Sequence, residues 1–416
     1  MSRSRVRPGR SLAGCALALA VACAACSSAP AGDASPSRAA APASSTGSPD
    51  GAGGGASSSP RPAPRSCAAR VYGRMTEAQR VGQLFIVGLP RDRLSAATAR
   101  AITGYHFGSV QFITTSTAGV AGIRPVTSAT QHLASARATA GARYFIAANQ
   151  EGGEVQALQG PGFAAIPAAT GQGLMPPAAL RRSAVGWGRE LRAAGVNLNF
   201  APVMDTVPAG SENLNQPIGV LHREFGQDPA TVAAHGVAFI RGMTKAGVSV
   251  TAKHFPGLGR VAGNTDFSSG VTDSVTTRDD AYLRPFRAAA GAGVPFVMVA
   301  LARYTRIDPG RLAVFSSAVM RGMLRQRLGF RGVIVSDDLG AAVAVAEVAP
   351  GQRATRFLAA GGDLITSKYP GPAMAMARAV LARARASGGF QRTVSSAVMH
   401  VLAAKQAAGL LPCRGR

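Results

Sequence analysis

The sequence has little charge for its length. Of its 416 residues, 16% are charged and 47% are hydrophobic. Disordered proteins have the opposite balance, so this composition excludes disorder over most of the chain. The length allows one large domain or two to three small ones, and either arrangement can bury a sizeable core.

Acidic residues and lysine are scarcer still. The chain has 20 acidic and 45 basic residues, for a formal net charge of +25. Four of the basic residues are lysines and the rest are arginines, a skew typical of GC-rich coding. A basic surface set by codon use is therefore the simplest interpretation, and attraction to a polyanion is the alternative. The sequence has no basic motif interleaved with aromatic residues, so we expect anionic cell-wall polymer rather than nucleic acid as such a partner.

The first 25 residues have the features of a secretory signal peptide. Four arginines lie within residues 3–10, and an apolar run, too short to cross a bilayer as a stable helix, follows over residues 11–25. The small residues before Cys26 resemble a bacterial lipobox, so we predict lipidation at Cys26, with Cys23 as the second candidate. We expect an exported protein, lipid-anchored at the outer face of the cell membrane or in the wall. Ordinary signal-peptidase cleavage and secretion are the alternative.

Residues 26–66 are almost entirely Ala, Ser, Pro and Gly. Such a segment cannot bury enough apolar surface to order itself. We interpret it as a disordered linker that precedes a single folded domain at residues 67–416.

Cysteine is rare, and its positions are informative. Of the 5 cysteines, only Cys67 and Cys413 lie in the predicted domain, at its two ends. Their spacing fits no metal site. Because an exported protein folds in an oxidising compartment, we predict a Cys67–Cys413 disulfide.

Short apolar runs rich in Val, Ile and Phe alternate with longer segments of helical periodicity. This alternation favours a parallel sheet, and eight such units suit an α/β fold of the (β/α)₈ TIM-barrel type. A doubly wound open sheet is the alternative, but its G-x-G-x-x-G fingerprint is absent from the sequence. The eight runs are Val81–Leu89, Gly108–Thr114, Tyr144–Gln150, Leu198–Pro202, Ser249–Phe255, Phe296–Leu301, Val333–Ser336 and Asp363–Ser367, and examples of the helical segments are Pro177–Ala194, Thr231–Ala246, Arg278–Ala290 and Ser317–Leu328.

Polar residues follow four of these runs. They occupy Asn149–Gly153, Asp205, Lys253–Gly257 and Ser336–Asp338. Active sites of barrels lie at the C-terminal ends of the strands, so we expect these residues to converge on one pocket.

Four blocks in this region resemble glycoside hydrolase family 3. Lys253–Gly259 reads KHFPGLG and resembles the K-H-F-P-G-[HL]-G signature, and Gly332–Leu339 reads GVIVSDDL and resembles the nucleophile segment. Asn199–Asp205 and Ile218–Pro229 match two further blocks, in the right order. The similarity covers roughly residues 75–370 and is strongest to the single-domain β-N-acetylglucosaminidases of cell-wall recycling.

The resemblance implies a role for each matching residue. Asp337 matches the nucleophile, which forms a covalent glycosyl-enzyme. Lys253, His254 and Arg223 match residues that hold the sugar, and Asp205 matches an aspartate that orients them. The chemistry is consistent, because basic donors keep a nearby carboxylate ionised and grip sugar hydroxyls. The alternative for Asp337 is a cap of the following helix, a role for which Asp338 is the better candidate.

The sequence departs from the family pattern in two places. The family's Asp-Ser-His or Asp-Thr-His, which supplies the general acid/base, is replaced by Asn264-Thr265-Asp266, and no histidine lies between residues 255 and 300. Asp266 is therefore the first candidate for the acid/base, and His222 is the second. In addition, Asn149 stands where the family commonly has an aspartate, which weakens one sugar contact by about 1–2 kcal/mol.

The sequence thus predicts a monomeric, exo-acting, retaining glycosidase that removes β-linked N-acetylglucosamine from peptidoglycan fragments. We expect no metal or organic cofactor, and contact with the membrane through the lipid anchor alone. One alternative is a weakly active or inactive lipoprotein that binds wall glycans, and another is an exo-β-glucosidase. The orientation of Asp266 in the loop at residues 258–270 distinguishes the enzyme from the binding protein.

Overall fold

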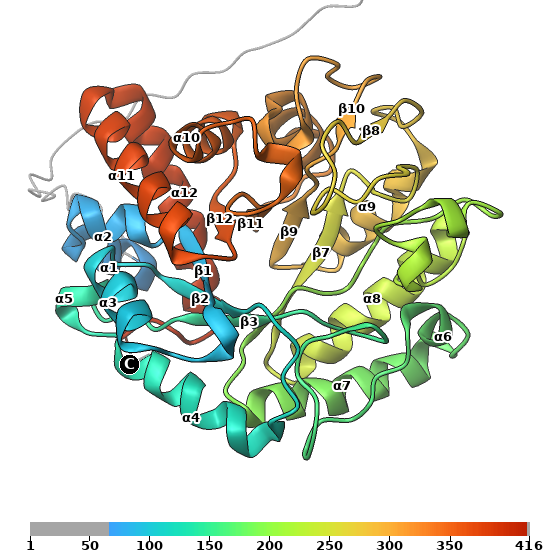
Figure 1. Ribbon diagram of the computed structural model, residues 1–416, viewed down its shortest axis with the longest axis horizontal. Helices are drawn as coiled ribbons and strands as arrows, with labels where there is room; N and C mark the ends of the chain where they lie inside the picture. Colours follow the sequence, from blue (N-terminus) through green and yellow to red (C-terminus); the bar gives the residue numbers. More distant parts are fainter. Residues whose placement is uncertain (1–65, 414–416) are drawn as a thin grey trace, which may run out of the picture. The chain divides into compact units, whose positions relative to one another are not determined.

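Eight parallel strands pair into a closed barrel in the computed structural model, which describes residues 66–413 (Figure 1). The strands follow the order β1-β12-β11-β9-β7-β6-β3-β2 around the barrel. This closure confirms the predicted TIM barrel. The barrel strands are β1 (Phe85–Leu89), β2 (Ser109–Phe112), β3 (Phe145–Ala148), β6 (Leu198–Asn199), β7 (Ser249–Phe255), β9 (Phe296–Val299), β11 (Val333–Asp338) and β12 (Leu364–Ser367).

Each barrel strand overlaps one of the eight predicted runs, because strands covered on both faces are continuously apolar. Among these eight strands, only β7 has the same boundaries as its run. Val81 belongs to helix α2 (Glu77–Gly82), whose start is fixed by a capping box between Thr76 and Gln79. The run that begins at Leu198 pairs over two residues only, and β11 continues past Ser336 to Asp338.

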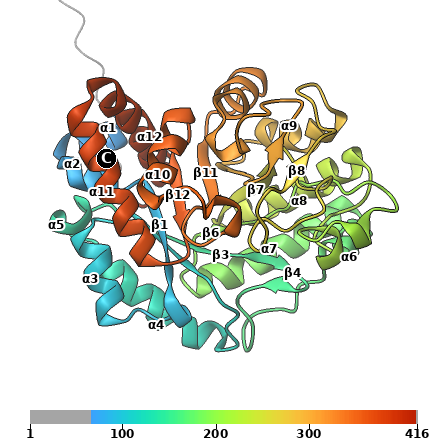
Figure 2. The same ribbon diagram turned by 45° about the horizontal axis from the view of Figure 1, so that its top comes forward.

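A helix follows every barrel strand and lies outside the barrel (Figures 1 and 2). The predicted helix at residues 278–290 begins later than expected, at Arg284, because Pro285 fits only the first turn of a helix. The helices, in strand order, are α3 (Ala96–Gly104), α4 (Gly119–His132), α7 (Pro177–Ala193), α8 (Pro229–Lys245), α9 (Arg284–Gly291), η6 (Ala318–Arg327), α10 (Pro350–Ala360) and α11 (Pro370–Ala386).

The two ends of the described chain are joined covalently. Helix α1 (Cys67–Arg74) packs against the last helix, α12 (Gly388–Ala407), and Cys67 forms a disulfide with Cys413, with an S–S distance of 2.07 Å. The predicted pairing is confirmed. In the chain-entropy view, a link across 346 positions strongly restricts the unfolded chain.

The predicted signal peptide, Cys26 and the linker up to residue 65 lie outside the described residues. Among residues 66–413, no helix combines the length and the apolar character that a membrane span requires.

Two short pairs of strands lie outside the ring of barrel strands (Figure 2). The hairpin of β4 (Gln150–Gly152) and β5 (Val155–Gln156) follows β3 directly. The parallel pair of β8 (Thr272–Asp273) and β10 (Arg303–Tyr304) joins the segments after β7 and β9. Both pairs lie in segments that follow the C-terminal ends of barrel strands. The pocket described below opens at the same ends.

Lys405 of α12 is fully buried without a charged partner. Its Nζ donates to Gln83 Oε1 and to the carbonyl oxygen of Gly108, both at 2.7 Å. Both acceptors are neutral, so burial lowers the pKa of Lys405 from 10.5 to about 7.

We expect the free energy of unfolding to rise as the pH increases from about 7 to 9.5. In this window the unfolded chain holds the Lys405 proton and the folded chain does not, so raising the pH favours folding, by about 3 kcal/mol. Urea unfolding at several pH values measures the slope. Lys405→Met should flatten it, whereas Lys245→Met, at an exposed position on α8, should leave it unchanged. Equal slopes in wild type and Lys405→Met would contradict this account.

Candidate active site

A polar pocket of about 240 Å³ opens at the C-terminal ends of the barrel strands. The structure brings side chains from five strand ends to this one place. They are Gln111 of β2, Asn149 after β3, Lys253 and His254 of β7, Asp337 of β11, and Thr366 and Lys368 at β12. Arg223 reaches the same pocket from the connection between β6 and α8.

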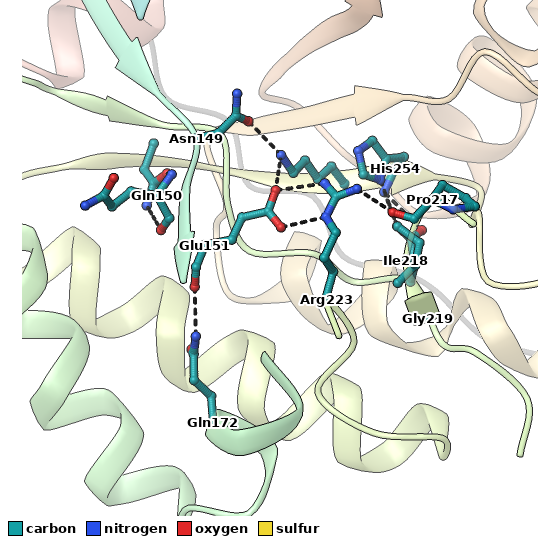
Figure 3. A network of polar contacts seen from close by, with 12 residues as sticks. Asn149, Gln150, Glu151, Gln172, Pro217, Ile218, Gly219, Arg223 and His254 are labelled. Atoms are coloured by element: carbon teal, nitrogen blue, oxygen red, sulfur yellow. Dashed lines mark hydrogen bonds and ion pairs between the residues drawn. The ribbon is translucent and has the colours of Figure 1, made fainter. Parts of the chain in front are cut away.

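Glu151 organises the basic side chains on one side of the pocket. Its carboxylate receives two hydrogen bonds from Arg223, each 2.8 Å long, and lies 2.6 Å from the Nζ of Lys253 (Figure 3). Lys253 also donates to Asn149 Oδ1 at 2.9 Å, and Arg223 donates to the carbonyl oxygen of Pro217 at 2.7 Å. These contacts fix the side chains of Lys253 and Arg223, and with them the directions in which their remaining N–H groups can donate.

The burial of this cluster makes its charges interdependent. Burial alone would raise the pKa of Glu151, but Arg223 and Lys253 outweigh it and hold the pKa at about 2. Burial would likewise lower the pKa of Arg223, and Glu151 more than offsets this. The cluster is therefore one ionised unit, and loss of the carboxylate would leave two buried cations without their counter-ion.

Asp205 lies beneath the pocket. It is fully buried and accepts hydrogen bonds from the backbone N–H and Nδ1 of His254 and from the N–H of Leu258. It does not itself line the pocket. Its contacts fix the ring of His254 and the start of the following loop, which is a positioning role rather than a contact with a ligand.

Asp337 is the last residue but one of β11 and lines the pocket. It is half-buried, and its Oδ1 accepts the N–H of Asp338 at 2.8 Å. Its charge helps to raise the pKa of Arg223, so the two groups are close enough to interact. Asp338 is buried and accepts the N–H groups of Gly340, Ala341 and Lys368. It thus closes a turn, not the helix that the sequence suggested, because α10 begins only at Pro350.

The loop after β7 brings Asp266 into the lining of the pocket. Asp266 and Asn264 both line the pocket, and Asn264 Oδ1 accepts the N–H of Asp266 at 3.0 Å. Asp266 Oδ2 lies 2.9 Å from the Nζ of Lys368. Burial would lower the pKa of Lys368, but Asp266 outweighs it and raises the pKa. His222, the second candidate acid, is exposed and is not among the residues that line the pocket.

Two charged residues that pair with side chains of the site, Glu151 and Lys368, were given no role from the sequence. Glu151 lies inside the predicted Asn149–Gly153 segment. Buried Arg223 and Lys253 need a counter-ion, and this need is the signal in the sequence that indicates Glu151. Lys368 directly follows the run that ends at Ser367, so the strand-end rule that selected the other residues also applies to it.

The fold and the pocket define a (β/α)₈-barrel protein with a polar, cation-rich site at the rim where barrel enzymes hold their active sites. The family model described as the glycosyl hydrolase family 3 N-terminal domain matches residues 76–403. The chain therefore belongs to glycosyl hydrolase family 3, as its motifs predict.

Relatives with solved structures or curated functions agree with this assignment. The crystal structure of a β-N-acetylhexosaminidase from Beutenbergia cavernae shares 45% identity, with a TM-score of 0.78, over 80% of this chain and 99% of that chain. A β-hexosaminidase of Xylella fastidiosa is 40% identical over 48% of this chain and 59% of its own length. A β-N-acetylglucosaminidase/β-glucosidase of Cellulomonas fimi is 33% identical over 70% of this chain and 50% of its own length. The chain spans less than two thirds of these two sequence relatives.

Proposed function

We propose that the protein is an exo-acting, retaining β-N-acetylhexosaminidase. The observation that carries this proposal is that Asp337, Arg223 and Lys253 line one pocket of about 240 Å³. Sites for drug-sized ligands occupy about 300–1,000 Å³, so this pocket suits a single sugar ring at the end of a chain. The printed names of the relatives support the choice of an N-acetylated hexose.

The proposed reaction proceeds in two displacements. Asp337 attacks the anomeric carbon while the bond to the aglycone oxygen breaks, and that oxygen takes a proton from Asp266. In the second step the Asp266 carboxylate takes a proton from a water molecule, and the water oxygen displaces Asp337 from the sugar. Two inversions at one carbon give net retention. Lys253, His254 and Arg223 hold the sugar hydroxyls through both steps.

The ion pair with Lys368 does not prevent Asp266 from acting as an acid. To donate to the substrate, Asp266 must exchange its contact with the Lys368 ammonium for one with the aglycone oxygen. However, both side chains are about one third exposed, at 34% and 36%. Pairs of this kind are worth about 0–1 kcal/mol, so the aglycone can displace the lysine at small cost.

We expect Asp266→Asn to lower kcat/KM by about 10²–10⁴-fold for a natural disaccharide, whose leaving group needs a proton. For a dinitrophenyl β-N-acetylglucosaminide, which leaves unprotonated, the loss should be far smaller. Steady-state assays of both substrates measure the difference, and Asp279→Asn, at an exposed aspartate outside the pocket, is the matched control. Equal losses on the two substrates would exclude Asp266 as the acid.

Two substrate specificities fit the proposed function, one for a β-N-acetylglucosaminide and one for a β-glucoside. The Cellulomonas fimi relative carries both activities in its name, which keeps exo-β-glucosidase activity as the second candidate. A comparison of kcat/KM for aryl β-N-acetylglucosaminide and aryl β-glucoside separates them. A wall-glycan-binding protein without turnover would hydrolyse neither compound.

We further propose that the protein is exported and lipid-anchored and acts on peptidoglycan fragments. The charged, apolar and small-residue segments that precede Cys26 support this proposal. Fatty-acid labelling of three variants tests the anchor site. We expect the label to be lost in Cys26→Ala and in Cys23→Ala/Cys26→Ala, and to persist in Cys23→Ala. Labelling that persists in the double variant would exclude it.

A further inference from the structure

The two ends of the barrel differ in charge. Because the strands are parallel, all segments that lead from a helix into the next strand lie at one end, opposite the active-site pocket. Among the described residues, the only carboxylate in these segments is that of Asp363, which is buried and paired with Arg325. The acidic residues lie mainly in the segments that leave the strands, as Asp266 and Asp308 do.

Exposed cations gather at the end opposite the pocket. Arg137 and Arg143 lie between α4 and β3, and Arg331 lies between η6 and β11. Arg192 and Lys245 are in the last turns of α7 and α8, which lead into β6 and β7. We call these five residues the basic face.

The charges of the basic face are not neutralised locally. Within residues 66–413, none of its five side chains is paired with a carboxylate. Arg385, which is also exposed, does have such a partner, because its Nε lies 3.0 Å from Glu77. A cation at the end of a helix stabilises that helix, but Arg143 and Arg331 lie outside helices and have no such role.

The chain enters the described domain at the same end. It does so at Ser66, the cap of α1, and the next residue, Cys67, is tied to Cys413 by the disulfide. The segment before Cys413 contacts the basic face, because the carbonyl oxygen of Leu410 accepts the N–H of Arg143 at 2.8 Å. The predicted lipid anchor is therefore linked to the domain at the end that carries the basic face.

We propose that the basic face docks on the surface of an anionic phospholipid bilayer. Phosphate headgroups supply the opposite charge, and each Lys or Arg near such a surface strengthens binding by about fivefold. The five cations come from four connections around one end of the barrel, which suits a planar surface better than a single polymer thread. Docking in this way directs the active-site pocket, at the other end, away from the bilayer. This contact adds to the predicted lipid anchor and does not depend on the proposed catalytic function.

Vesicle binding by a charge-reversed variant tests the basic face. Arg137→Glu/Arg143→Glu/Arg331→Glu is made in the full chain with Cys23→Ala/Cys26→Ala, which lacks both candidate lipidation sites. The vesicles are phosphatidylcholine alone or an equal mixture with phosphatidylglycerol. We expect the parent chain to sediment with the mixed vesicles only, and the variant to bind them about 100-fold more weakly.

The matched control reverses three exposed charges at the pocket end. Arg91→Glu/Arg93→Glu/Arg306→Glu lies on the segments after β1 and β9 and should bind as the parent chain does. Equal losses in the two variants would overturn the proposal, because attraction would then follow net charge alone. A parent chain that ignores the mixed vesicles but binds soluble anionic wall polymer through the basic face would also overturn it, in favour of the polymer.

Arginine modification tests the orientation without any substitution in the basic face. Phenylglyoxal and peptide mass spectrometry measure the rate of modification at each arginine. Mixed vesicles should slow this rate severalfold at Arg137 and Arg143 and leave it unchanged at Arg306, near the pocket end. Equal protection at both ends of the barrel, with the protein bound, would contradict docking through the basic face.

Discussion

Asp337→Ala is expected to lower kcat for an aryl β-N-acetylglucosaminide by at least about 10⁴-fold, the order of loss when a covalent catalyst loses its nucleophile. The carboxylate stands at the pocket end of β11, and the barrel keeps the rest of the site in place without it. We therefore expect KM to change much less than kcat. Asp279→Ala, at an aspartate that is 76% exposed, should retain full activity.

Chemical rescue distinguishes a lost nucleophile from a damaged fold. The shorter alanine side chain leaves room for azide, which can attack the anomeric carbon of an activated substrate from the same side as Asp337. This single displacement should restore release of the aryl group and give a sugar azide of inverted configuration. A variant that keeps more than a few per cent of activity, or whose azide product retains the substrate configuration, would contradict the role of Asp337.

Glu151→Gln is expected to cost about 3–5 kcal/mol of unfolding free energy, because it keeps the shape of the side chain but leaves Arg223 and Lys253 buried without a counter-ion. Glu77→Gln is the matched control. It removes the charge of an ion pair with Arg385 whose side chains are 62% and 48% exposed. Such a surface pair is worth about 0–1 kcal/mol. Urea unfolding of both variants measures the difference.

The pH dependence of stability gives an independent check of the same cluster. Because the folded pKa of Glu151 is about 2, below its usual 4.5, its stabilising contribution is complete above pH 4.5 and is lost as the pH falls toward 2. The contribution amounts to about 3 kcal/mol. Glu151→Gln should remove this part of the acid sensitivity. A small effect of the substitution at pH 7, equal to that of Glu77→Gln, would show that the cluster is not one ionised unit.

The barrel could be predicted from the sequence because its strands are buried on both faces. Such strands are mostly apolar, so the alternation of apolar runs with helical segments predicts all eight. Their limits could not be predicted, because pairing and capping decide them. A capping box assigns Val81 to a helix, and Pro285 delays the start of α9. Neither signal is part of the apolar pattern.

The positions of strand ends could be predicted from the sequence, whereas contacts between side chains on distant segments could not. Lys253 and Asp337 stand at strand ends, so the geometry of a barrel brings them together. The contact between Asp266 and Lys368 joins residues 102 positions apart and depends on the path of a loop.

The most direct test of the central claim is the configuration of the first product. Proton NMR during hydrolysis of an aryl β-N-acetylglucosaminide resolves the two anomers before they interconvert. A double displacement through Asp337 predicts that the β-anomer is formed first and that the α-anomer accumulates only by later mutarotation. The α-anomer as first product would mean direct attack by water and would contradict the covalent role of Asp337.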